Sequence, residues 1–85
     1  MKHAGPEAIA ALAPLLKELR TLPGLTERKP GTFYRGSRAF LHFHEDPAGM
    51  FADVRLKSDG DFERLRVSTA AERKRLISLA RKALL

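Results

Sequence analysis

Apolar residues recur at helical spacing near the start of the chain, within residues 5–24. Four of them lie three or four positions apart and therefore share one face of a predicted helix: Ile9, Leu12, Leu16 and Leu19. We expect this face to be buried. Pro14 removes one internal hydrogen bond, so a break there into two short helices is the alternative. Pro23 and Gly24 end the helical pattern.

The final stretch, residues 68–85, has helical spacing too. Thr69 and Glu72 have the spacing of a capping box, in which each side chain binds the backbone N–H of the other residue. The apolar positions that follow share one face: Leu76, Ile77, Ala80 and Leu84. This pattern predicts a second helix that packs through that face.

Between the helical stretches, short runs rich in strand-forming residues alternate with turn signals. The runs are TFYR (32–35), RAFLHFH (38–44), MFADVRL (50–56) and DFERLRV (61–67). The turn signals are Gly36-Ser37, Asp46-Pro47-Ala48-Gly49 and Ser58-Asp59-Gly60. Short strands joined by such turns predict an antiparallel meander of four strands.

The hydrophobic pattern sets the register of the middle hairpin. Two pairings keep four apolar residues on one face, whereas a slip of one residue would not: Leu41 with Val54, and Phe43 with Ala52. The same register places His42 opposite Asp53. Two-residue turns at Gly36-Ser37 and Asp59-Gly60 suit the turn types that hairpins prefer. The second of these turns would place Asp53 opposite Arg66.

One face of the predicted sheet is therefore apolar. It holds Tyr34, Ala39, Leu41, Phe43, Met50, Ala52, Val54, Leu56, Leu65 and Val67. Both helices should pack on this face, which gives an α+β two-layer sandwich in the order α-β-β-β-β-α. At 85 residues the chain is expected to form a single domain, residues 1–85.

The opposite, open face mixes aromatic and basic side chains. Its predicted partner-binding residues are Phe33, Arg35, Arg38, Phe40, His42, His44, Phe51, Asp53, Arg55, Phe62, Arg64 and Arg66. Exposed aromatic patches are typical of protein interfaces, so association with a second copy or another protein is the first interpretation. Aromatic side chains interleaved with arginines are also typical of single-stranded nucleic-acid binding, which is the alternative.

His42, His44 and Asp53 raise the question of catalysis or metal binding. His42 and Asp53 have the groups of a general base, but no serine or cysteine nucleophile lies beside them. We therefore expect a cross-strand polar pair and no enzyme activity. His42 and His44 point the same way from one strand and, with Asp53, offer three metal ligands. The neighbouring Arg55, Arg64 and Arg66 would repel a cation, so no metal and no cofactor is expected, and metal binding by the three ligands is the alternative.

Composition adds a basic charge and excludes some classes of protein. The net charge of +6 and the isoelectric point near 10.3 favour attraction to nucleic acid or acidic surfaces. The absence of cysteine excludes a disulfide framework and a thiolate metal site. No apolar run approaches the roughly 20 residues of a transmembrane helix. We therefore expect a cytoplasmic protein with no membrane partner.

Residues 22–40, LPGLTERKPGTFYRGSRAF, carry a resemblance to a known family. The matching residues are Leu22, Pro23, Gly24, Glu27, Gly31 and Phe33. In this segment the chain resembles the MmcQ/YjbR-like family of small bacterial proteins, in which a helix ends in Leu-Pro-Gly before the first strands. The resemblance implies a helix-and-antiparallel-sheet fold for which DNA binding has been suggested, and it names no catalytic residue. The later part of the chain departs from the family because it is shorter.

Overall fold

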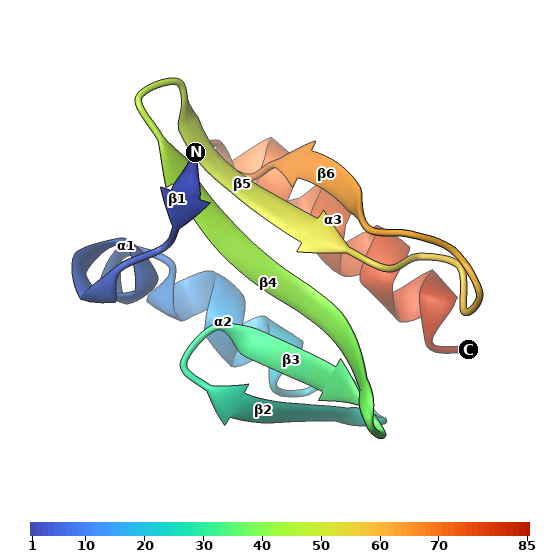
Figure 1. Cartoon of the computed structure of the whole chain (residues 1–85). Helices are drawn as coiled ribbons and strands as arrows, with labels where there is room; N and C mark the ends of the chain where they lie inside the picture. The colour runs from blue at the N-terminus through green and yellow to red at the C-terminus, as the bar shows by residue number, and fades with distance from the viewer.

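The computed structural model describes residues 1–85. Its elements in chain order are β1 (Lys2–His3), α1 (Pro6–Ala11), α2 (Ala13–Leu19), β2 (Leu25–Lys29), β3 (Thr32–Arg35), β4 (Arg38–Asp46), β5 (Gly49–Val54), β6 (Glu63–Arg66) and α3 (Ala70–Ala83). The sheet is antiparallel in the order β2-β3-β4-β5-β6, and β1 pairs with β4. All three helices lie on one side of this sheet, behind the strands in Figure 1. The predicted α+β fold is confirmed, with five meander strands where four were predicted.

The additional meander strand is β2, which forms a hairpin with β3. Pro30 and Gly31 connect the two strands, and Gly31 has a φ of 81°, the sign that the second central residue of a type II turn requires. β2 lies at the edge of the sheet, and Glu27, Arg28 and Lys29 make up most of it. Its sequence therefore lacks the apolar alternation from which the other strands were predicted.

The N-terminal helical stretch is broken into two short helices, which was the alternative prediction. α1 ends at Ala11, and Pro14 lies in the first turn of α2. A first-turn N–H has no partner within its helix, so proline costs no hydrogen bond there. None of the three helices is long and apolar enough to cross a membrane.

The hydrophobic core lies between the helices and the sheet. α2 and α3 bury the residues that helical spacing places together: Leu15, Leu16 and Leu19, and Leu76, Ile77 and Ala80. The sheet contributes Leu41, Phe43, Ala52, Val54 and others. The capping box that begins α3 is confirmed, because Thr69 Oγ1 accepts from Glu72 N at 3.1 Å and Glu72 Oε1 accepts from Thr69 N at 2.9 Å.

β5 pairs with β4 on one side and with β6 on the other, and only the first of these two registers was predicted correctly. Between β4 and β5 the predicted register is confirmed, and His42 lies opposite Asp53. Between β5 and β6, Asp53 lies opposite Arg64, so the predicted pairing with Arg66 is wrong. The connection spans residues 55–62 and turns at Lys57–Gly60, instead of closing as a two-residue turn. Because this register shift is two residues, Arg64 and Arg66 keep their predicted face.

A β-bulge corrects the predicted faces of Phe33 and Phe40. Phe33 pairs with Leu41 while Tyr34 pairs with Ala39, so Phe40 is an extra residue in β4. The bulge interrupts the alternation, and the side chains of Phe33 and Phe40 join the core, with 1% and 2% of their surface exposed. Their predicted place on the open face is therefore wrong.

The same bulge affects the residues that follow in the β3–β4 hairpin. Tyr34, predicted on the helix-covered face, lines a hollow of the open face together with His42. Arg35, predicted on the open face, donates from Nη1 to the backbone oxygen of Ala83 at 3.0 Å, so it reaches the end of α3. Arg38 is exposed and lies opposite Arg35 at the hairpin end.

Candidate functional site

Asp53 is the centre of a polar cluster on the open face of the sheet. It is the one charged residue that is buried, with 8% of its surface exposed. Arg64 holds it from the neighbouring strand with two hydrogen bonds, from Nε to Oδ1 at 2.8 Å and from Nη2 to Oδ2 at 2.9 Å. This paired geometry fixes the orientation of the carboxylate.

Two histidines of β4 approach the same carboxylate oxygen. His44 Nε2 lies 3.1 Å and His42 Nε2 lies 3.5 Å from Asp53 Oδ2. The other ring nitrogen of His44, Nδ1, is buried and has no hydrogen-bond partner. The predicted residues His42, His44, Asp53 and Arg64 are thus brought together in one cluster, which we call the histidine–aspartate cluster.

The surroundings lower the pKa of both Asp53 and His42, for different reasons. The hydrogen bonds from Arg64 lower the pKa of Asp53, and this effect outweighs the burial that opposes it. Burial lowers the pKa of His42, and the attraction of Asp53 opposes this only in part. Asp53 is therefore ionised at neutral pH, and His42 is neutral.

Aromatic contacts fix the histidine rings from both sides. His3 stacks on His44 with ring centroids 4.7 Å apart, and its ring lies 5.8 Å from that of His42. Phe62 meets His42 edge to face at 4.8 Å. His3 was missed by sequence reasoning, because a two-residue strand has no periodicity to reveal it.

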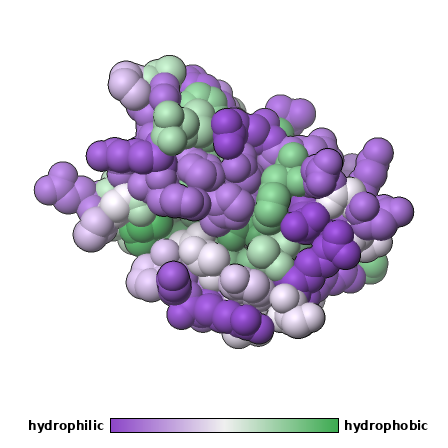
Figure 2. Space-filling view, viewed as in Figure 1, coloured by the Kyte–Doolittle hydropathy of each residue, from purple (hydrophilic) through white to green (hydrophobic).

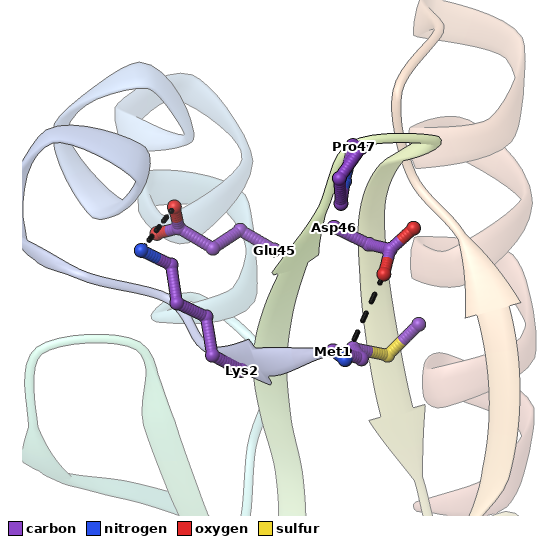
Figure 3. A pocket seen from close by; sticks show the side chains of 5 residues that line it. All are labelled: Met1, Lys2, Glu45, Asp46 and Pro47. Atoms are coloured by element: carbon purple, nitrogen blue, oxygen red, sulfur yellow. Dashed lines mark ion pairs between the residues drawn. The ribbon is translucent and has the colours of Figure 1, made fainter.

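Ion pairs and a backbone hydrogen bond place β1, and with it His3, against β4. Lys2 Nζ lies 3.5 Å from Glu45 Oε1, and the amino group of Met1 lies 3.7 Å from Asp46 Oδ1 (Figure 3). Glu45 Oε2 also accepts from Gly5 N at 2.7 Å. These residues and Pro47 surround an open hollow of about 530 Å³. Its two carboxylates are already engaged in holding β1.

A second hollow lies beside the histidine–aspartate cluster. Its volume is about 450 Å³, and its lining residues are His3, Ala4, Arg28, Lys29, Pro30, Thr32, Tyr34 and His42. None of these side chains is acidic. The guanidinium of Arg28 lies over the ring of Tyr34, 4.1 Å from its centroid. We call this the basic hollow.

Sequence reasoning missed most of the basic hollow. Arg28 and Lys29 belong to the strand that was not predicted, and Tyr34 was assigned to the wrong face. The Pro30-Gly31 turn ahead of a strand-forming run was the available signal for this hairpin.

The remaining aromatic residues of the open face are partly covered. Arg55 lies over the ring of Phe62 at 4.4 Å, and its Nε donates to the backbone oxygen of Ala39 at 3.0 Å. Phe51 is half-buried between its strand partners His44 and Arg66. Accordingly, Figure 2 shows a mostly hydrophilic surface on this side, interrupted by separate apolar areas.

Comparison with family models, curated proteins and solved structures finds no match to this chain. The resemblance of residues 22–40 to the MmcQ/YjbR-like family therefore stays a prediction.

Proposed function

We propose that the open face binds single-stranded nucleic acid and that the basic hollow takes one of its nucleotides. The observation that carries this proposal is the lining of the hollow, which combines the Arg28–Tyr34 stack with Lys29 and contains no carboxylate. Single-stranded nucleic acids bind to surfaces of this kind, because bases stack on aromatic rings while arginine and lysine neutralise phosphates.

The volume of the basic hollow and the charge of the residues around it agree with such a ligand. A volume of about 450 Å³ lies within the roughly 300–1,000 Å³ of small-ligand sites. Asp53 lies 3.5 Å from His42 of the lining, and because Arg64 engages it, it repels a phosphate less than a free carboxylate would. Arg55, which lies over Phe62, adds a basic side chain to the face, and the whole chain has a net charge of +6.

Self-association was the first interpretation of the sequence, and it relied on four phenylalanines. Phe33 and Phe40 lie in the core, so the open face keeps only Phe51 and Phe62, both half-buried. The apolar area that could drive a dimer is therefore smaller than predicted. Self-association stays a prediction, and a measurement of the mass of the protein in solution tests it.

The test is fluorescence anisotropy with labelled oligonucleotides, single-stranded DNA, single-stranded RNA and a duplex of the same length. Tyr34→Leu should weaken single-strand binding about 5- to 150-fold, which corresponds to ~1–3 kcal/mol for one stacked base. Arg28→Ala should weaken binding and reduce the salt dependence by about 0.7 in log–log slope for each phosphate that the variant no longer neutralises.

A matched control separates the hollow from general attraction. Arg75→Ala removes the same charge from an exposed position on α3, on the other side of the sheet, and should change the affinity little. Equal losses in Arg28→Ala and Arg75→Ala would contradict a defined site. A wild type that shows no binding at low salt, and that forms a dimer by light scattering, would replace the proposal with self-association.

A further inference from the structure

We propose that His42, His44 and Asp53 bind a divalent transition-metal ion of the Zn²⁺ class. Their ligand atoms all lie within 4.8 Å of one another. Imidazole nitrogens and a carboxylate oxygen are ligands that Zn²⁺ accepts, and three protein ligands leave one position open to water. This inference goes beyond nucleic-acid binding and does not depend on it.

Two of the three distances between ligand atoms in the cluster are close to those of a tetrahedral metal site. Bonds of about 2.0–2.1 Å in a tetrahedral site separate neighbouring ligand atoms by roughly 3.3–3.4 Å. The Nε2 atoms of His44 and His42 lie 3.1 and 3.5 Å from Asp53 Oδ2. An ion can therefore be accommodated among these atoms by small movements of the side chains.

The backbone and the surrounding rings hold the ligands in place. His42 and Asp53 are direct cross-strand partners, and His44 is two residues further along the same face of β4. His3 and Phe62 pack against the imidazoles, so the rings have few alternatives to their present orientation. Little conformational entropy is left to lose when an ion binds.

Arg64 is the group that opposes metal binding. Its Nη2 occupies Asp53 Oδ2, the oxygen that faces both histidines, while its Nε binds Oδ1. The Arg64 side chain is half exposed and can withdraw Nη2 into solvent while keeping the bond to Oδ1. His44 Nδ1 also lacks the acceptor that usually orients a metal-bound histidine. Both features lower the affinity, and the first can be removed by mutation.

The experiment is a calorimetric titration of the chelator-treated full chain with Zn²⁺, in the absence of nucleic acid. We expect saturable binding of one ion per chain, and no comparable binding of Mg²⁺, which prefers oxygen ligands. Asp53→Asn and His44→Gln each remove or weaken a ligand. Changes next to a metal ligand typically cost roughly 10- to 100-fold in affinity, so these two should cost at least as much.

Arg64 supplies a change in the opposite direction. Arg64→Gln removes the competing cation and should tighten Zn²⁺ binding by roughly three- to tenfold, after allowance for screening at this half-exposed position. Arg66→Gln is the matched control, because Arg66 contacts Glu72 and Ala48 rather than Asp53, and should leave the affinity nearly unchanged.

Three outcomes would overturn the metal site. They are the absence of saturable Zn²⁺ binding to the wild type, uptake that survives both ligand substitutions, and an Arg64→Gln variant that binds more weakly. If His44→Gln does not fold, the more exposed His42→Gln tests the same ligand set. None of these results bears on the oligonucleotide test of Tyr34→Leu, because Tyr34 is outside the ligand set.

Discussion

The two faces of the sheet are built from the same strands and are held by different forces. Along β4, Leu41 and Phe43 point to the helices and are buried, while His42 and His44 point to the open side and stay partly exposed. Contacts on the helix-covered face are apolar and numerous, so truncating one buried side chain removes many contacts and much buried area. The open face depends on a few directed contacts around Asp53. Substitutions should therefore cost more stability on the first face than on the second.

The largest expected effect compares one phenylalanine on each side of the sheet, Phe33 in the core and Phe62 on the open face. Phe33→Ala should lower the free energy of unfolding by about 3–5 kcal/mol, as expected for a fully buried ring. Phe62→Ala on the open face should cost about 1–2 kcal/mol, through its contacts with His42 and Arg55. Urea unfolding followed by circular dichroism measures both.

A control guards this comparison against a variant that does not fold. Phe33→Leu and Phe62→Leu keep more of the apolar volume and should preserve the same order of costs. A larger cost for the Phe62 variants would mean that Phe33 does not lie in the core, and the difference between the two faces would disappear.

The second effect concerns the buried charge. Asp53→Asn should lower the free energy of unfolding by about 1.5–3 kcal/mol, because the charged hydrogen bonds between Asp53 and Arg64 are lost. The cost is not larger because the half-exposed Arg64 side chain can still be solvated by water. Glu63→Gln, at an exposed neighbouring position of β6 with no ion pair, is the control and should be close to neutral. If the two variants had equal stability, the Asp53–Arg64 pair would not be what holds the open face.

Strong alternation of apolar and polar residues made the β4–β5 hairpin predictable from the sequence. The bulge made the β3–β4 hairpin unpredictable. Leu41, Phe43, Ala52 and Val54 admit a single register that buries all four, so the position of His42 opposite Asp53 followed. The sequence around Phe40 alternates equally well, and nothing in it marks an extra residue. Only packing shows that Phe40 belongs to the core.

The site was predictable in part for similar reasons. His42, His44 and Asp53 were placed together because they share the one register that was firmly set. The arginine that holds Asp53 was misassigned, since Arg64 and Arg66 have the same face and differ only through the length of a loop. His3 reaches the cluster through a two-residue strand that tertiary ion pairs hold in place, and such pairs leave no local signal.

The smallest effect is expected at His42. His42→Gln should cost at most about 1 kcal/mol at pH 7, the range of a cross-strand polar pair. The groups around His42 are His3 on β1, His44 on β4, Asp53 on β5, Arg64 on β6, and Arg28 and Lys29 across the basic hollow. Burial is the largest cause of the lowered pKa of His42 in the folded protein, and the attraction of Asp53 opposes it only in part.

The lowered pKa gives this prediction its direction. Below pH 6.5 the unfolded chain protonates His42 before the folded chain does, so the wild type loses stability as the pH falls from 7 to 5. His42→Gln lacks this group, and its stability should fall less over the same range. Urea unfolding of both proteins at several pH values, with a chelator present to exclude metal binding, measures the difference. The contrary outcome is a wild type whose stability falls no more than that of the variant. The imidazole of His42 would then have to be charged in the folded state. The polar cluster of the open face would in that case tolerate cations more readily than its burial implies.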